Sequence, residues 1–261
     1  MATSALDAWI HQYLMLETIN LQKSFGGIVA ANNINLKIPV SDEKFIGIIG
    51  PNGAGKTTLI NLLTGFLRPD GGQVIFINKD ITKTSPEVRT RMGIIRTFQI
   101  PMLFENLTVK EILSLSVVKK RINNDFKLFK NLISNKYISA KVEYLLGLFE
   151  LAKYSNVKAK ELPFGIKRLL EIAAAFALEP VVLFLDEPFA GLNDQEIEDL
   201  INILTKFSQQ ISNIVIVEHK ITHLQKIIDR LIVMASGTIV ADGKPDVVIN
   251  SDIVRKVYWG Q

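Results

Sequence analysis

The sequence contains no cysteine among its 261 residues. This absence excludes disulfide bonds and thiolate metal sites, and it suits a reducing cytosol. Long apolar runs are also missing, because the longest one, residues 172–185, is interrupted by Glu179-Pro180 and is too short to cross a bilayer. The apolar patch near the N-terminus contains Asp7 and His11 and follows no basic region, unlike a signal peptide. We therefore expect any membrane association to be made through a partner protein.

Long runs of one charge sign are absent as well. The 30 Lys and Arg residues exceed the 26 Asp and Glu residues, which gives a net charge of +4 and an isoelectric point near 9.1. Such a balance suits nucleic acid or an anionic membrane surface, but the basic runs are as short as Lys119-Lys120-Arg121, which is typical of a solvated face. We expect no nucleic-acid partner. The 48% hydrophobic content excludes a disordered chain, and the length allows one large core with an inserted subdomain.

The sequence does contain a complete phosphate-binding pattern, G-x-x-x-x-G-K-[ST], directly after the apolar run 45–49. Its glycines let successive N–H groups point at phosphate oxygens, and the helix predicted to follow adds a partial positive charge. Lys56 is predicted to reach the β- and γ-phosphates, and the Thr57 hydroxyl to ligate Mg²⁺. An ordinary glycine turn would not need this Lys-Thr pair. The predicted nucleoside-triphosphate site comprises Gly50, Pro51, Asn52, Gly53, Ala54, Gly55, Lys56, Thr57 and Thr58.

A second motif predicts what happens to the nucleotide. The apolar run 181–185 reads as a strand buried on both faces of a parallel sheet, and it ends in Asp186-Glu187-Pro188. Ligands of open α/β sheets bind beyond the carboxyl ends of strands. Asp186 suits a magnesium ligand, and Glu187 is then placed to activate a water that attacks the γ-phosphate. The alternative is a solvated acidic pair at a strand end.

A histidine follows a third strand-like run, residues 214–218. His219 could hydrogen-bond the γ-phosphate from that position, although a lone histidine is more often a packed or surface residue. His11 and His223 lack such a context and are interpreted as structural.

Together with further residues, these motifs resemble the ATP-binding cassette family from about Leu16 to Gln261. The resemblance implies an α/β fold, namely a P-loop NTPase (RecA-like) core with an antiparallel β subdomain and an inserted α-helical subdomain. It also implies ATP and Mg²⁺ as cofactors. In chain order, it is carried by Phe25, residues 50–58, Gln99, Leu162-Pro163-Phe164-Gly165-Ile166, Asp186-Glu187, Asn193 and His219.

The resemblance implies roles that the spacing of the residues does not establish. Phe25 would stack on adenine, Gln99 would contact Mg²⁺ or the attacking water, and His219 would complete the catalytic group. Gly165 would complete the ATP site of a second subunit, and Asn193 would lie at the dimer interface. The alternatives are a core position for Phe25, and surface-loop positions for Gln99 and Asn193.

The segment around Gly165 departs from the family's commonest form, Leu-Ser-Gly-Gly-Gln. Pro163 stands at the serine position and provides neither a hydroxyl nor a backbone N–H, and Phe164 replaces the first glycine. Branched-chain amino acid cassettes are similar here, so we interpret both as a subfamily trait. Ile166 loses a polar contact, and Lys220 replaces a frequent aspartate. We expect hydrolysis slower than typical, with the catalytic carboxylate still present.

The organisation of the chain follows from the same resemblance and from periodicity. Val142, Leu145, Leu146 and Phe149 share one helical face and are predicted to be core. Residues 1–14 are predicted to be a dispensable extension of a single cassette at 15–261. The alternative is a docking element formed by Ala5, Trp9 and Leu14, by helical spacing. Within the cassette we expect a nucleotide-binding core at about 15–98 and 166–245, a helical subdomain at about 99–165, and a tail at 246–261.

The resulting interpretation is a peripheral ATPase subunit of a membrane transporter, at the cytoplasmic face of the inner membrane. The expected partners are integral-membrane permease subunits, a second cassette subunit as homo- or heterodimer, and indirectly a solute-binding protein. The branched-chain amino acid importer class is favoured by Arg96-Thr97-Phe98-Gln99 and by the Pro-aromatic-Gly segment. Urea or amide importers and the lipopolysaccharide exporter are alternatives within transporters. A soluble ABC ATPase is the alternative outside them, although this chain has neither two cassettes nor a coiled-coil insertion.

The apolar segment 100–109 is expected to help form the groove that receives a short permease helix. Flexible Met102 and aromatic Phe104 suit such a contact. The alternative is that Leu103 and Phe104 only anchor the helical subdomain.

Overall fold

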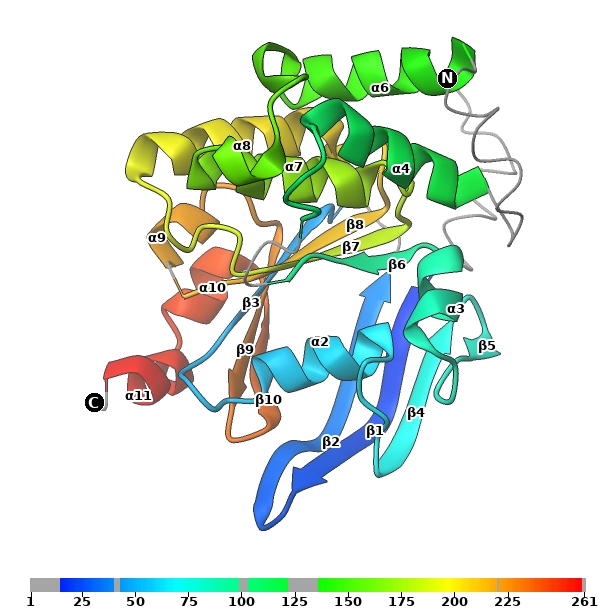
Figure 1. Cartoon of the computed structure of the whole chain (residues 1–261). Helices are drawn as coiled ribbons and strands as arrows, with labels where there is room; N and C mark the ends of the chain where they lie inside the picture. The colour runs from blue at the N-terminus through cyan, green and yellow to red at the C-terminus, as the bar shows by residue number, and fades with distance from the viewer. Residues whose placement is uncertain (1–14, 40–42, 99–102, 122–135, 220, 260–261) are drawn as a thin grey trace, which may run out of the picture.

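The computed structural model describes residues 15–39, 43–98, 103–121, 136–219 and 221–259. In these residues two β-sheets and a group of helices build the molecule (Figure 1). The predictions for residues 1–14, Gln99, Met102 and Lys220 lie outside the described residues. Within the described part of the chain, no helix is both long and apolar enough to cross a bilayer.

The larger sheet has six strands in the order β10-β9-β3-β8-β7-β6. Neighbours from β9 to β6 are parallel, and β10 pairs antiparallel with β9 at one edge. Every residue of β3, β7 and β8 is buried, as expected for apolar strands covered on both faces. The strands are β3 (Phe45–Ile49), β6 (Ile94–Arg96), β7 (Val182–Asp186), β8 (Asn213–Val217), β9 (Arg230–Ala235) and β10 (Thr238–Gly243).

The smaller sheet is antiparallel, with the order β2-β1-β4-β5. It consists of β1 (Met15–Phe25), β2 (Ile28–Pro39), β4 (Gly71–Phe76) and β5 (Lys79–Asp80). Alternate residues of β2 are buried from Ile34 to Ile38, which is the pattern of a strand with one solvent face. Helix α2 (Lys56–Thr64) lies between the two sheets, and its Leu59 and Leu63 share one buried core with both (Figure 1).

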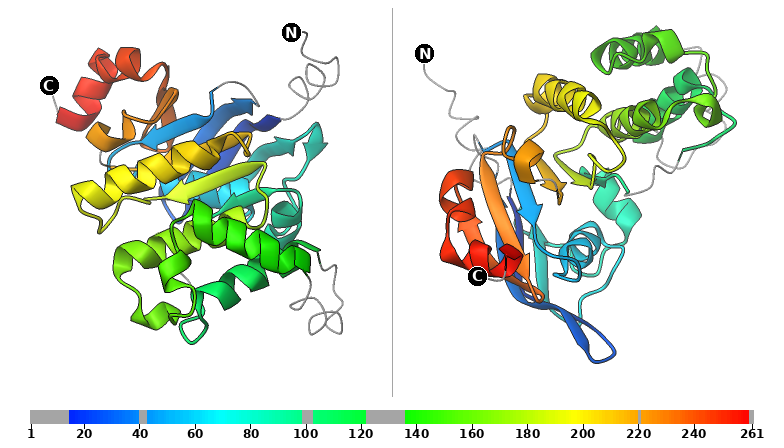
Figure 2. Two further views of the ribbon diagram at one scale, coloured as in Figure 1. Left: turned by 90° about the horizontal axis from the view of Figure 1, so that it is seen from above. Right: turned by 90° about the vertical axis from the view of Figure 1, so that its left-hand side faces the viewer.

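Helices cover the other face of the larger sheet (Figures 1 and 2). Their core includes the rings of Phe149, Phe176 and Phe207, whose centroids lie 4.7 to 5.7 Å apart. The predicted apolar face is confirmed, because Val142, Leu145, Leu146 and Phe149 are all buried in this core. The helices are α4 (Val109–Arg121), α6 (Lys136–Leu148), α7 (Phe164–Phe176) and α8 (Asp194–Ser208), with 3₁₀ turns at Ala152–Tyr154 and Ala159–Glu161.

Short helices complete the fold at its edges. They are α3 (Pro86–Arg91), α9 (Ile221–Leu224), α10 (Pro245–Ile249) and α11 (Asp252–Trp259). Helix α7 begins at Phe164, directly after Pro163, which is the N-cap and has an extended ψ of 154°. The mixed α/β class with a P-loop core is thus the fold expected from the sequence.

Candidate functional site

The phosphate-binding pattern forms a tight loop between β3 and α2. Gly53 and Gly55 have φ values of 78° and 98°, which favour glycine. A Cβ atom on Gly55 would lie 2.2 Å from the carbonyl oxygen of Ala30, so β2 packs directly on the loop. The Ala54 carbonyl accepts a hydrogen bond from the Gly237 N–H at 3.0 Å, which fixes the loop to the turn between β9 and β10. The loop is therefore held from two sides.

Lys56 is turned into this loop. Its Nζ donates hydrogen bonds to the carbonyl oxygens of Gly50 at 2.7 Å and Pro51 at 3.1 Å, and the residue is 6% exposed. Burial lowers the pKa of Lys56, while the charges of Glu187 and Asp186 oppose that shift. The ammonium group thus lies between the loop and the two carboxylates, where an anionic phosphate would be its natural partner.

A cavity of about 280 Å³ opens over the loop. Its walls come from segments that are far apart in the sequence: the β2 strand, the loop with the start of α2, and the ends of β7 and β8. The structure thus brings together the phosphate loop, Glu187 and His219, as the sequence predicted. The lining residues are Ile28, Ala30, Asn52, Gly53, Ala54, Gly55, Lys56, Thr57, Thr58, Glu187 and His219.

Asp186 is the last residue of β7 and is 3% exposed. Its Oδ2 accepts a hydrogen bond from Arg96 Nη2 at 3.0 Å in a buried ion pair. Burial raises the pKa of Asp186, and the nearby Arg96 cation works against that shift. Asp186 is therefore a buried carboxylate whose charge is balanced by a cation from the neighbouring strand.

Glu187 has a backbone φ of 48°, a left-handed conformation that few non-glycine residues adopt. Its N–H donates to the Val217 carbonyl at 2.9 Å, which holds the conformation from β8. Such backbone conformations cluster at functional sites. The Glu187 side chain faces His219, with Oε1 2.8 Å from Nε2. The two candidate catalytic groups are thus in direct contact.

Glu218 is a part of this arrangement that the sequence reasoning missed. The side chain is buried, and its Oε1 accepts a hydrogen bond from the Phe189 N–H at 2.6 Å. Its Oε2 accepts from the His219 N–H at 2.9 Å. The carboxylate therefore ties the segment after Glu187 to the segment that carries His219. A charged residue inside the apolar run 214–218 was the available signal, because a buried charge needs partners.

The sequence motif 96–99 includes Arg96, but it does not predict the contact of Arg96 with Asp186. Arg96 ends β6, which is parallel to β7, so its side chain and that of Asp186 lie at the same edge of the sheet. A cation and a carboxylate at the carboxyl ends of two parallel strands were the signal for this pair.

The donor set fits a magnesium–nucleotide group. Thr57 lines the cavity, and the buried Asp186 directly precedes Glu187, which lines it too. Both candidate protein donors are hard oxygens. In the described residues, no group of three or more His, Cys, Asp or Glu side chains is arranged to hold a metal alone. Mg²⁺ bound to nucleotide normally uses one or two protein oxygens and takes the rest from phosphate and water. The cradle of loop N–H groups at the start of α2 suits the phosphates.

Gly165 does not reach this cavity. It lies in the first turn of α7 and lines a separate cavity of about 80 Å³ with Ile166, Leu192 and Glu196. Phe164, which is 46% exposed, packs on Gly191, where a Cβ atom would lie 2.8 Å from its ring. In one chain the phosphate loop and Gly165 are therefore apart.

Two further predicted residues have defined positions. Phe25 ends β1 and is 46% exposed, so the alternative of a core position is wrong. Its strand partner Ile28 lines the cavity over the phosphate loop. Asn193 is the N-cap of α8: its side chain accepts from the Glu196 N–H, and the Glu196 carboxylate accepts from the Asn193 N–H. This capping role was not predicted, and Gln99 lies outside the described residues.

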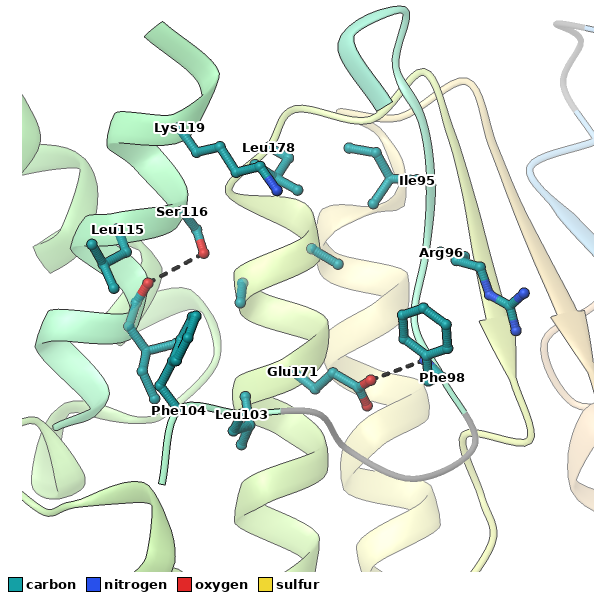
Figure 3. A pocket seen from close by; sticks show the side chains of 13 residues that line it. Ile95, Arg96, Phe98, Leu103, Phe104, Leu115, Ser116, Lys119, Glu171 and Leu178 are labelled. Atoms are coloured by element: carbon teal, nitrogen blue, oxygen red, sulfur yellow. Dashed lines mark hydrogen bonds between the residues drawn. The ribbon is translucent and has the colours of Figure 1, made fainter. Parts of the chain in front are cut away.

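A second cavity, of about 300 Å³, lies between the sheet and the helices. In Figure 3 the side chains of β6 and Phe98 lie on the right, those of α4 on the left, and those of α7 between them. Phe104 is 67% exposed, so it does not serve only as an anchor, whereas Leu103 packs on the helical core. The lining residues are Ile95, Arg96, Phe98, Leu103, Phe104, Ile112, Leu115, Ser116, Lys119, Glu171, Ala174, Ala175 and Leu178.

Comparisons with known proteins agree with this site. A family model described as ABC transporter matches residues 31–190. The branched-chain amino acid transport ATP-binding protein BraF of Pseudomonas aeruginosa is 36% identical over 95% of this chain and 98% of its own length. LivG of Escherichia coli, of the same description, is 34% identical over 95% and 98%.

Solved structures give the same result. A nucleotide-free ATP-binding cassette from an ABC transporter superposes with a TM-score of 0.81 at 33% identity, over 95% of this chain and all of that one. An ATP-binding cassette in its ADP conformation gives 0.79 at 32% identity, over 95% and 99%.

Proposed function

Because this chain belongs to the ABC transporter family, we propose that it is the peripheral ATPase of an importer for branched-chain amino acids or similar small polar solutes. As a member of the family, it is an ATP-binding and ATP-hydrolysing subunit of a transporter. The observation that carries the proposal is the single cavity in which the phosphate loop, Glu187 and His219 meet.

The roles proposed for the residues follow from their positions. Lys56 would exchange its bonds to the loop carbonyls for the β- and γ-phosphates, and Thr57 and Asp186 would hold Mg²⁺. The bound metal ion supplies positive charge that polarises the phosphates. Glu187 would accept a proton from the attacking water, and His219, 2.8 Å from Glu187, would orient that carboxylate and the γ-phosphate. Gln99 is proposed to contact the metal or the water, and Phe25 the adenine ring.

A second cassette subunit is the expected partner at this site. Gly165 lies away from the cavity of its own chain and Phe164 beside it is half exposed. We propose that Gly165 completes the nucleotide site of the opposite subunit, with N–H groups at the start of α7 facing the phosphate. Asn193, at the exposed start of α8, would lie in the same interface.

The solute class rests on the similarity to BraF and LivG, which extends over nearly the whole of those chains. Urea or amide importers and the lipopolysaccharide exporter are the competing transporters, and a soluble ABC ATPase is the competitor outside them. Uptake of labelled leucine, and separately of urea, by cells that lack this subunit separates the importers. Purification of the tagged chain from membranes distinguishes a permease partner from a nucleic-acid partner.

We propose that the subunit acts at the cytoplasmic face of the inner membrane, with a solute-binding protein acting indirectly.

The cavity in Figure 3 is the proposed contact with a permease helix. Phe104 is exposed at its rim, and Leu115 and Leu178 supply apolar wall. Phe104→Ala should leave ATP binding by the isolated subunit intact and sharply reduce co-purification with the permease and transport-coupled hydrolysis. Tyr137→Ala, which removes an exposed aromatic ring on α6 outside the cavity, is the matched control. Normal assembly and transport by Phe104→Ala would show that the groove is elsewhere, and unfolding of the subunit would show that Phe104 is structural.

A further inference from the structure

Arg96 stands where three parts of the nucleotide site meet. The side chain is 6% exposed, and its Nη2 contacts Asp186 Oδ2 at 3.0 Å. Its Nη1 donates to Asn61 Oδ1 on α2, one turn after Thr57. One guanidinium group therefore joins β6, the magnesium aspartate at the end of β7, and the helix that follows the phosphate loop.

The same group is held by aromatic rings. The guanidinium carbon of Arg96 lies 4.6 Å from the centroid of Phe98 and 5.4 Å from that of Phe66, and the two rings meet edge to face. The Phe98 N–H donates to Glu171 Oε1 at 2.9 Å, and its carbonyl accepts from Arg168 Nη1 at 2.8 Å. Figure 3 shows Glu171 facing Phe98, with Arg96 next to them at the edge of the cavity. Arg96 is thus linked through Phe98 to α7, the helix that carries Gly165.

The charges explain why a cation is needed at this point. Asp186 is almost fully buried, and an unpaired carboxylate in such a place is strongly destabilising. Within the described residues, the ion pair of Asp186 is made by Arg96, because the Lys56 ammonium is directed at the carbonyls of Gly50 and Pro51. Arg96 donates to Oδ2 of Asp186, so a magnesium ion would bind through the other carboxylate oxygen, Oδ1. Arg96 and a magnesium ion would then share one carboxylate.

We propose that Arg96 is a positioning residue that serves as the counter-cation of Asp186 in the nucleotide-free protein, and that magnesium takes over part of this role when it binds. The inference rests on the proposed magnesium–nucleotide site and extends it. Binding of magnesium weakens the hold of Arg96 on Asp186.

Thermal unfolding of the full chain tests this inference without measuring hydrolysis. The midpoint Tm is measured for the wild type and Arg96→Met without ligand, with ADP and EDTA, and with ADP and Mg²⁺. Arg96→Met should lower the Tm of the ligand-free protein by roughly 10 °C, because it leaves Asp186 unpaired. The rise in Tm caused by Mg²⁺ with ADP should then be larger than in the wild type, since magnesium replaces the lost cation. With ADP and EDTA, the rise in Tm above the ligand-free value should be the same for Arg96→Met and the wild type.

Arg89→Met is the matched control. Arg89 is also fully buried, and it donates to the carbonyls of Leu62, Leu63 and Ile81 at 2.6 to 2.8 Å, away from Asp186. Its loss should lower Tm equally with and without Mg²⁺, as for any structural residue. In an Asp186→Asn background, Arg96→Met should no longer increase the magnesium-dependent rise.

Four results overturn or redirect the inference. Equal magnesium-dependent rises in Arg96→Met and the wild type would show that Arg96 is only structural, and a smaller rise would show that it assists magnesium directly. If Arg96→Met does not fold, Arg96→Lys is used in its place, because lysine keeps the charge without the fork that reaches both Asp186 and Asn61. The magnesium-dependent rise in Tm of Arg96→Lys should exceed that of the wild type, by less than is expected for Arg96→Met. An equal rise in Arg96→Lys and the wild type would contradict the inference. Absence of any rise in the wild type itself would contradict the proposed nucleotide site instead.

Discussion

Glu218→Gln is the change that tests most sharply how the catalytic residues are held. The Glu218 carboxylate accepts hydrogen bonds from the backbone N–H groups of Phe189 at 2.6 Å and His219 at 2.9 Å. Glutamine keeps one acceptor oxygen, but its amide nitrogen cannot accept from the second N–H. In the variant, one of the two backbone N–H groups therefore loses its charge-assisted hydrogen bond and faces the NH₂ group of the glutamine, which is also a donor, in a buried place.

The magnitude follows from these contacts. A hydrogen bond to a charged group contributes about 1.5–3 kcal/mol, and a buried donor without a partner costs about 1–3 kcal/mol. We expect the free energy of unfolding to fall by about 2–4 kcal/mol. His219 Nε2 lies 2.8 Å from Glu187 Oε1, so a shift of the His219 backbone disturbs that pair. Because a misplacement of about 1 Å can reduce a rate about 10²-fold, kcat should fall by roughly 10- to 100-fold. The KM for ATP should change little.

Two assays measure these effects. Urea unfolding gives the free energy of unfolding, and steady-state phosphate release gives kcat and KM. The control is Glu143→Gln on α6, where the side chain is 60% exposed and pairs with Lys110, so that its loss should cost at most about 1 kcal/mol. If Glu218→Gln unfolds and hydrolyses ATP like the wild type, Glu218 does not hold His219 and the loop after Glu187 together.

Two further predictions concern the phosphate loop. Lys56→Ala should weaken nucleotide binding itself, because it removes the ammonium group that the loop holds near the two carboxylates. Calorimetric titration with ATP measures this affinity, and a wild-type affinity would contradict the assignment of the loop. Gly55→Ala should abolish nucleotide binding and lower Tm, because the new Cβ would lie 2.2 Å from the Ala30 carbonyl oxygen at a φ of 98°. Gly27→Ala, where a Cβ meets nothing within 4 Å, should change neither, and equal behaviour of these two variants would refute the steric argument.

The sequence predicts those features of the fold that depend on residues close together in the chain. The loop 50–58 and the runs that end in Asp186 and Val217 combine a motif with a continuous apolar strand, and parallel strands bring their carboxyl ends to one edge. The meeting of Lys56, Glu187 and His219 follows from that topology. Helical periodicity likewise located Val142 and Phe149 in the core, because burial of one face is repeated every turn.

Fewer features could be predicted where a contact depends on two segments that are distant in the sequence. Arg96 and Asp186 are 90 residues apart, and nothing in either motif states that their side chains pair. The exposure of Phe25 and Phe104 agrees with the contacts expected for them from the resemblance, whereas residue type alone would favour burial, since aromatic residues are usually buried. Asn193 was expected at an interface, and its capping of α8 is compatible with that prediction, which is still to be tested.

The proposed mechanism of hydrolysis depends most directly on Glu187 as the residue that activates water. Steady-state ATP hydrolysis by Glu187→Gln, measured beside ATP binding by the same preparation, tests it. Glutamine keeps the size of the side chain and leaves Lys56, Thr57 and Asp186 in place, so binding should be preserved. Loss of one such catalytic group typically lowers the rate about 10²–10⁴-fold, and we expect a fall of that size. Near-wild-type turnover by this variant, with ATP still bound, would contradict the proposed mechanism.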